Sequence, residues 1–173
     1  MGTVNCRLNC DKGSLPPMGG KKWEKCPELR CPYNKYGIAG KKVLSVTMPW
    51  TYFIMECGKD IENRTWRTDY RGRILIHASK KVPSNYQAII DDVIHSMPVG
   101  KISKNNWNEI AKKWCGFIVG SVELVDCVKN YKSPWAEPDI WHWILKNPVL
   151  FKEPIPARGQ LGLWEYKEYG ERV

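Results

Sequence analysis

The chain has 173 residues, which is enough for one domain and a small appendage. Its hydrophobic content of 43% and its charged content of 26% are typical of a globular protein and exclude a disordered chain. No window approaches the ~18 apolar residues of a membrane span, and the N-terminus lacks an apolar signal segment, so we expect an intracellular, cytoplasmic protein. The net charge of +9 favours polyanionic partners, among which nucleic acid is the commonest.

Residues 1–40 differ from the rest of the chain, because they are rich in Cys, Pro, Gly and Lys and too poor in apolar residues to form a core. Their four cysteines form two pairs whose spacings suit a structural zinc site, and a metal would supply the free energy that this segment lacks. An iron–sulfur cluster on the same thiolates and four unrelated thiols are the alternatives, whereas disulfides are not expected in an intracellular chain. The predicted zinc ligands are Cys6, Cys10, Cys26 and Cys31.

From residue 41 to residue 173 the apolar pattern is that of one folded domain. Alternating and β-branched runs predict strands over 43–47, 73–78, 117–125, 141–145 and 161–166. Helical spacing and capping residues predict helices over 50–57, 84–96 and 106–112. The Pro-rich link 152–156 is expected to be extended. Strands from both ends of this region, with helices between them, predict a mainly β (α+β) fold: a β-barrel with peripheral helices.

The most unusual feature is a charge cluster that lies between two apolar segments. It contains Lys59, Glu62 and Arg64. Unpaired buried charge is costly, so such a cluster is either a self-satisfying ion network or the floor of a site for a polar ligand. A Lys and an Arg suit a phosphate or a base carbonyl, and Glu62 could accept hydrogen bonds from an exocyclic amine. A solvated turn with one surface ion pair is the alternative.

The charge cluster is one of several ordered motifs over residues 43–166. The others are Leu44-Ser45-Val46, Pro49-Trp50, Tyr70-Arg71-Gly72-Arg73, Ile76-His77-Ala78, Gly120 to Cys127, Pro154-Ile155-Pro156 and Gly162-Leu163-Trp164. Together they resemble the ASCH (activating signal cointegrator homology) domain family. The Gly-x-Lys-x-x-Glu-x-Arg core of that family resembles Gly58, Lys59, Glu62 and Arg64, although Gly58 and Lys59 are adjacent here.

The resemblance implies a PUA-like β-barrel that binds RNA, DNA or a nucleotide in a cleft lined by Lys59, Glu62 and Arg64. Stacking on Trp50 or Trp66 would suit a base. Arg71, Arg73, Lys80 and Lys81 would extend a basic face beside this cleft.

An enzyme is the second hypothesis. Some relatives in the family remove the acyl group from an N4-acylated cytidine with a Lys, a Thr and a Glu, and others are ribonucleases. Lys59 and Glu62 would then be catalytic, with Glu62 in place of the Thr. A protein-interaction domain with a purely structural charge cluster is the third.

Two further side chains near these motifs receive structural interpretations. His77 ends an apolar strand and is interpreted as a packed, hydrogen-bonded histidine. Ser45 is interpreted as a partner of the backbone rather than a nucleophile.

Overall fold

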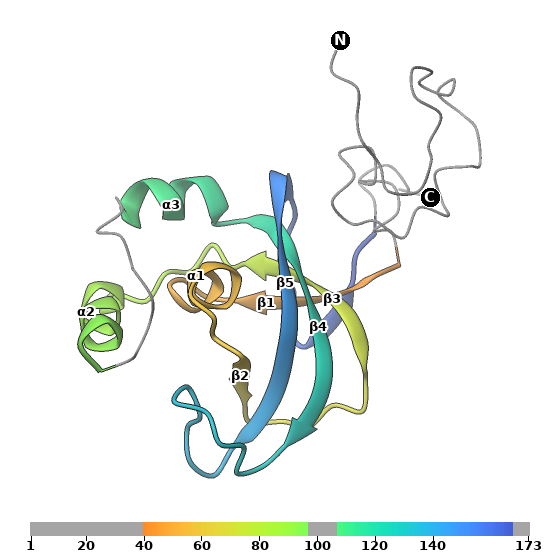
Figure 1. Ribbon diagram of the computed structural model, residues 1–173. Helices are drawn as coiled ribbons and strands as arrows, with labels where there is room; N and C mark the ends of the chain where they lie inside the picture. Colours follow the sequence, from red (N-terminus) through yellow and green to blue (C-terminus); the bar gives the residue numbers. More distant parts are fainter. Residues whose placement is uncertain (1–39, 97–106, 168–173) are drawn as a thin grey trace, which may run out of the picture.

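A computed structural model describes residues 40–96 and 107–167. The four cysteines of the predicted zinc site lie outside these residues, as does nearly all of the predicted N-terminal segment 1–40. The elements are β1 (Lys42–Val46), α1 (Trp50–Glu56), β2 (Ile61–Arg64), β3 (Gly72–Ala78), α2 (Tyr86–Ser96), α3 (Trp107–Trp114), β4 (Phe117–Val128), β5 (Trp141–Pro156) and β6 (Leu163–Glu165) (Figure 1).

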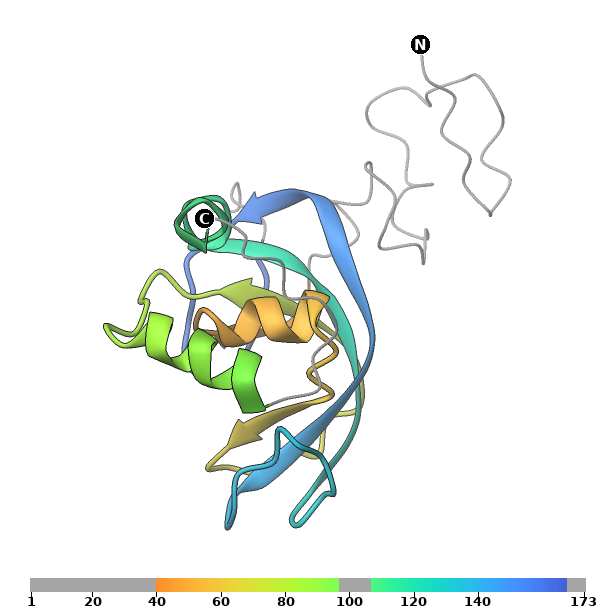
Figure 2. The same ribbon diagram turned by 60° about the vertical axis from the view of Figure 1, so that its left-hand side comes forward.

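In the described ranges, six strands form one sheet in the order β2-β5-β4-β3-β1-β6. All neighbouring strands are antiparallel except β1 and β3, which run parallel and place Ser45 beside His77. A parallel pair needs a long connection, and here the chain makes it through α1 and β2. The long strands β4 and β5 curve around α1 (Figure 2), so the sheet is a half-barrel. The expectation of a mainly β, PUA-like fold is confirmed.

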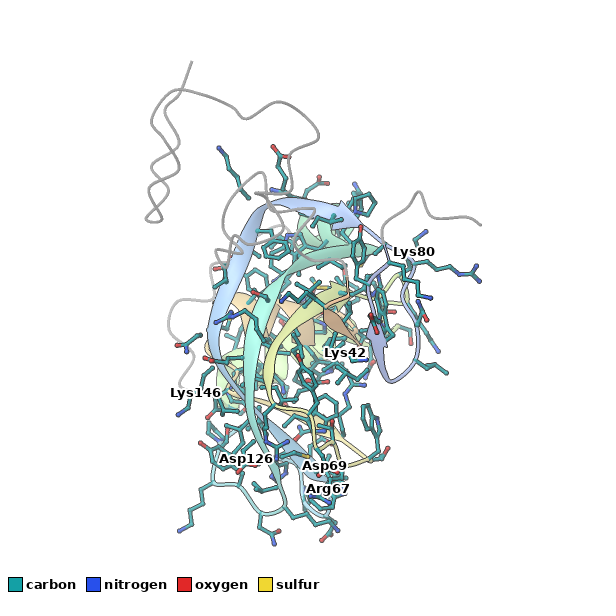
Figure 3. All side chains as sticks on the ribbon, turned by 90° about the vertical axis from the view of Figure 1, so that its right-hand side faces the viewer. Lys42, Arg67, Asp69, Lys80, Asp126 and Lys146 are labelled. Carbon is teal, nitrogen blue, oxygen red and sulfur yellow. The ribbon has the colours of Figure 1, made fainter. Side chains whose placement is uncertain are left out.

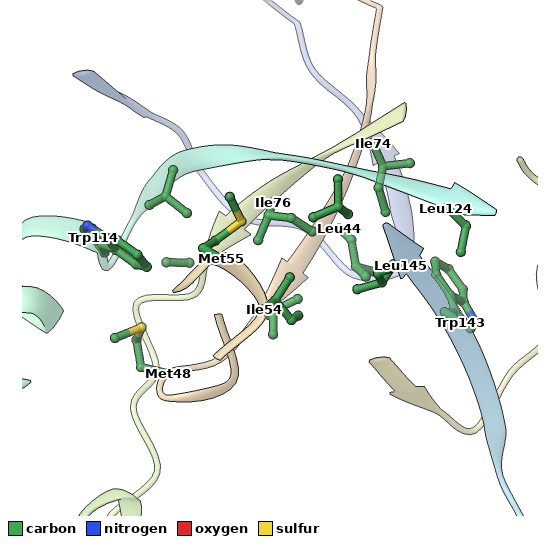
Figure 4. Packing of buried hydrophobic residues seen from close by; sticks show 14 of the residues in the cluster. Leu44, Met48, Ile54, Met55, Ile74, Ile76, Trp114, Leu124, Trp143 and Leu145 are labelled. Carbon is green, nitrogen blue, oxygen red and sulfur yellow. The ribbon is translucent and has the colours of Figure 1, made fainter. Parts of the chain in front are cut away.

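The main core fills the concave side of the sheet. Leu44, Ile76 and Trp143 are buried there with Ile54 of α1 (Figure 4). Helix α1 therefore lies inside the curve, and only α2 and α3 lie at the periphery as expected (Figure 1). No helix in residues 40–96 or 107–167 has the length and apolar character to cross a membrane.

A second, smaller cluster covers the opposite face of the sheet. Side chains alternate along a strand, so Ile74 and Ile76 of β3 enter the main core while Leu75 belongs to the second cluster. Leu75 packs there with Val43, Ile118, Trp164 and Tyr166, and Phe151, Ile155 and Ala157 lie against them. His77 follows Leu75 by two residues and lies on this same face, which places it beside the pocket described below.

The sequence predictions differ from the structure at two strands. The charge cluster contains an unexpected strand, β2, which pairs with Trp141–Ile144 at the start of β5. The strand expected over 141–145 continues to Pro156, so the extended Pro-rich link is the end of β5. Residues 157–162, hereafter the strap, connect β5 to β6.

Candidate functional site

The charge cluster is an ion network along β2. Glu62 accepts from two cations: its Oε2 lies 3.4 Å from Lys59 Nζ, and its Oε1 lies 3.1 Å from Arg64 Nη2. Lys59 is 4% exposed and Glu62 is 8% exposed. Each buried charge thus has a partner of opposite sign, which lowers the cost of burying both.

Lys59 is enclosed by the protein. Its ammonium donates to the carbonyl of Ile61 and to Glu62, and it lies 5.7 Å from the ring of Trp50 and 5.9 Å from the ring of Trp135. Aromatic faces attract cations at such distances. Lys59 is therefore held by carbonyl, carboxylate and π faces.

Arg64 belongs both to this ion network and to the lining of a pocket. Its Nη2 donates to the carbonyl of Ser45 at 2.9 Å as well as to Glu62. Its Nε is buried and has no hydrogen-bond partner among the described residues. Arg64 lines the pocket, whereas Lys59 and Glu62 do not.

The pocket has a volume of about 1250 Å³ and lies between the strap and the ends of β1 and β3. The strands contribute Ser45, Thr47 and His77 to its lining. The rest of the lining consists of Arg64, Ser79, Lys80, Lys81, Cys115, Gly116, Phe117, Ile155, Pro156, Tyr166 and the strap residues Ala157, Arg158, Gly159, Gln160, Leu161 and Gly162.

The charges that line the pocket are all positive. Arg64, Lys80, Lys81 and Arg158 contribute four cations, and no Asp or Glu within residues 40–96 or 107–167 is among the lining residues. Lys80, Lys81 and Arg158 make no ion pair with a carboxylate in residues 40–96 or 107–167. Repulsion among such cations is relieved when an anion binds between them. The pocket is therefore suited to an anionic ligand.

Two further sets of contacts position the residues that line the pocket. The side chain of Lys80 lies against Gly116, where an added Cβ would be 2.8 Å from Lys80 Cε. The strap is tied to the domain by three hydrogen bonds: Ala157 N donates to Gly116 O at 3.0 Å, Ser45 Oγ to Gln160 O at 3.0 Å, and His77 Nε2 to Ala157 O at 3.2 Å. The strap wall thus depends on Ser45 and His77.

Two titratable side chains in the pocket have shifted pKa values because of burial. Burial lowers the pKa of His77 below its usual 6.5, Lys80 adds to the lowering, and the hydrogen bond to Ala157 opposes it. Burial raises the pKa of the Cys115 thiol. Both shifts favour the uncharged form, so the cations dominate the charge of the described lining residues.

The other predicted binding residues lie elsewhere. Arg71 pairs with Asp126 at 2.7 Å, and Arg73 donates to Ser121 Oγ and Asn147 O. Asp126 lies at the opposite end of the sheet from Lys80 (Figure 3). The ring of Trp66 packs edge-on against Trp143, and Trp50 packs on Phe53 and Lys59. None of Trp50, Trp66, Arg71 and Arg73 lines the pocket, whereas Lys80 and Lys81 do.

Sequence reasoning missed the strap and the role of His77. The structure confirms that His77 is a packed histidine, since it is 1% exposed and hydrogen-bonded. Its contact with Ser45 follows from the parallel register of β1 and β3, for which the sequence carries no local signal. In the described ranges, no group of three or more His, Cys, Asp or Glu side chains is placed to hold a metal ion.

Comparison with known proteins places this domain in a family. The chain is 28% identical to human "Activating signal cointegrator 1" over 138 residues, which are 75% of this chain and 23% of that protein. The mouse protein of the same name matches with the same identity and coverage. The chain thus spans about a quarter of the length of these relatives. The model of the ASCH domain matches residues 44–169, and the chain belongs to the ASCH domain family.

Proposed function

We propose that this chain binds nucleic acid, RNA or DNA, and that phosphates of the bound strand occupy the pocket between the strap and β1 and β3. The observation that carries the proposal is the charge of the lining, which has four cations and no carboxylate among the residues that the structure describes. Contacts of Lys and Arg with phosphates supply most of the affinity of non-specific nucleic-acid binding. The net charge of +9 favours the same class of partner at longer range.

Arg64 gives the pocket a fixed donor. Its guanidinium is held by Glu62 and by the carbonyl of Ser45, and its buried Nε–H has no acceptor among the described residues. Glu62 is then a positioning residue, because it acts on the ligand through Arg64.

The pocket also offers apolar surface for the base or sugar of a bound nucleotide. Phe117 is partly exposed in the lining, and Leu161 at the rim is 98% exposed. Apolar and aromatic side chains next to a basic groove are the usual contacts for unpaired bases. A single strand is therefore the form of nucleic acid that the pocket suits best.

The test uses variants that remove one charge each. Lys80→Ala and Arg158→Ala should weaken binding of a fluorescently labelled oligothymidylate by about tenfold, the value of one hydrogen bond between charged groups. Each should also reduce the salt dependence of binding, by about 0.7 in the logarithmic slope for each lost phosphate contact. Fluorescence anisotropy at several salt concentrations measures both quantities.

Lys146→Ala is the matched control, because Lys146 is exposed on β5, does not line the pocket and lies apart from Lys80 in Figure 3. It removes the same formal charge, so a general effect of net charge would lower its affinity equally. Equal losses in all three variants would refute the pocket as the site. Absence of measurable binding by the unaltered chain would refute nucleic-acid binding altogether.

A further inference from the structure

Two buried histidines in the domain have different hydrogen-bond environments. His77 is 1% exposed and His142 is 2% exposed, and each has a partner at both ring nitrogens. A neutral imidazole carries one N–H donor and one acceptor nitrogen. The hydrogen-bond partners of the two ring nitrogens therefore show how many N–H groups each ring needs in order to satisfy them.

The ring of His142 is satisfied when it is neutral. Its Nδ1 accepts from the N–H of Tyr131 at 3.0 Å, and its Nε2–H donates to the carbonyl of Glu137 at 2.8 Å. The neutral ring thus offers one N–H donor and one acceptor nitrogen, and its two partners are a carbonyl acceptor and an N–H donor. A hydrogen on Nδ1 would point at the N–H group of Tyr131.

The environment of His77 is one hydrogen short when the ring is neutral. Its Nε2 lies 3.2 Å from Ala157 O, and its Nδ1 lies 3.2 Å from Ser45 Oγ. The same hydroxyl lies 3.0 Å from Gln160 O and receives the indole N–H of Trp164 at 3.1 Å. These four contacts need four hydrogens, whereas Trp164, Ser45 and a neutral His77 supply three.

Protonation of His77 supplies the missing hydrogen. Nδ1–H then donates to Ser45 Oγ, Nε2–H donates to Ala157 O, and the Ser45 hydroxyl donates to Gln160 O. Burial and Lys80 oppose this charge, and in the pocket without a ligand they prevail. Without water, the protein's own groups therefore make all four contacts at once only when His77 carries a positive charge.

In the described part of the chain, the surroundings of His77 contain cations and no compensating anion. Ser45 and Trp164, which contact it from β1 and β6, are neutral, and near Trp164 the carboxylate of Glu165 is already paired with Lys42 at 3.6 Å. The titratable groups that line the pocket with His77 are Arg64 from β2, Lys80 and Lys81 after β3, Cys115 after α3, Arg158 in the strap and Tyr166 after β6. An anion in the pocket would offset the repulsion between these cations and a protonated His77. The hydrogen bonds of the ring would then favour the protonated form of His77.

We propose that His77 takes up a proton when an anionic ligand enters the pocket, so that ligand and proton bind cooperatively and the contacts of the strap with Ser45 and His77 are stabilised. This inference rests on the proposed function, and it adds a regulation of the same site by pH. Because such coupling is reciprocal, the ligand raises proton affinity by the same factor by which the proton raises ligand affinity. His77 is a positioning residue for the strap and a source of added positive charge.

The experiment uses the full chain and oligothymidylate, whose phosphodiesters and thymines do not titrate between about pH 5 and 8. Titration calorimetry in two buffers of different ionisation enthalpy gives the number of protons taken up, and anisotropy gives the dissociation constant across this range. We expect net proton uptake near neutral pH. Affinity should rise on acidification by about tenfold for each unit by which the ligand raises the pKa of His77.

His77→Gln keeps a polar side chain but cannot titrate in this range, so it should bind without the uptake and with a flatter pH profile. His95→Gln is the control, because His95 is exposed on α2 and does not line the pocket. It should behave as the unaltered chain. If His77→Gln does not fold, NMR titration of the His77 ring in the unaltered chain, with and without oligothymidylate, measures the same coupling.

The outcomes separate this inference from the function on which it rests. Binding without proton uptake, an identical pH profile in His77→Gln, or a His77 pKa that the ligand leaves unchanged would overturn the coupling and leave nucleic-acid binding intact. Failure of the unaltered chain to bind at any pH would overturn both.

Discussion

Replacing Glu62 by Gln removes the charge that joins two cations and keeps the shape of the side chain. Lys59 would lose the carboxylate 3.4 Å away and retain the carbonyl of Ile61, and Arg64 would lose the carboxylate 3.1 Å away. The side chain of Lys59 is 2% exposed and that of Arg64 is 23% exposed, so water can compensate Arg64 but not Lys59. Removing one partner of a buried pair costs about 3–5 kcal/mol. Because Gln can still accept one hydrogen bond, we expect about 3 kcal/mol.

Urea unfolding followed by tryptophan fluorescence measures this loss, and a thermal scan should show a drop of roughly 10 °C. Glu109→Gln is the matched control, because Glu109 pairs with Lys112 where both side chains are more than half exposed. Such pairs contribute no more than about 1 kcal/mol. The double variant Lys59→Met, Glu62→Gln should recover stability relative to Glu62→Gln, because the uncompensated ammonium is gone. A loss in Glu62→Gln no larger than that in the control would refute the account of the ion network.

Three other predictions concern the strap, the pH dependence of stability and the N-terminal cysteines. Because the folded state holds the pKa of His77 below 6.5, the unfolded chain binds more protons as the pH falls through that value, so the free energy of unfolding should decrease on acidification there. Urea unfolding at a series of pH values should show a smaller decrease in His77→Gln, and an unchanged decrease would contradict the assignment. Gly159→Ala would place a Cβ 2.4 Å from His77 Cε1, so the strap must shift. We expect about 1–3 kcal/mol of destabilisation together with weaker oligothymidylate binding. Unaltered binding would show that the strap is not part of the site. Finally, freshly purified full-length chain should contain about one zinc ion, which Cys26→Ser should lose; a folded, metal-free preparation would refute the zinc prediction.

Most helices and strands of the domain could be predicted from sequence because their apolar patterns are local. The mostly apolar run 43–47 contains β1, and the helical spacing in 84–96 corresponds to α2. Strand β2 was missed because its residues Ile61–Arg64 include only one apolar side chain. These residues form a strand because they pair with β5, and because Glu62 neutralises the charges of Lys59 and Arg64. Tertiary contacts, rather than propensity, decide such a strand.

The length of β5 was underestimated because prolines normally interrupt a sheet. Pro148 and Pro154 nevertheless lie within this strand. Strand β2 pairs with β5 only at 141–144, so beyond that point β5 has one partner, β4, in the described structure. Proline lacks an N–H group and is tolerated where one side of a strand needs no partner. This edge position depends on the sheet order, which the sequence does not encode locally.

The charged motif could be recognised from sequence, and the pocket could not. The sequence spacing correctly predicted that Lys59, Glu62 and Arg64 form one cluster. It did not show that Lys59 and Glu62 are buried and that Arg64 lines the pocket. The pocket itself joins the ends of β1 and β3 to the strap: His77 and Ala157 are 80 residues apart in the chain, and Ser45 and Gln160 are 115 apart. Such a site arises only when the sheet is assembled.

The most direct test of the central claim is NMR mapping of backbone amide shifts in the full chain as oligothymidylate is added. The pocket predicts the largest changes at Ser79–Lys81, at Gly116 and in the strap, with small changes at the opposite end of the sheet near Asp126. Largest changes around Arg67, Arg71 and Asp126, with the strap unaffected, would contradict the claim that this pocket binds nucleic acid.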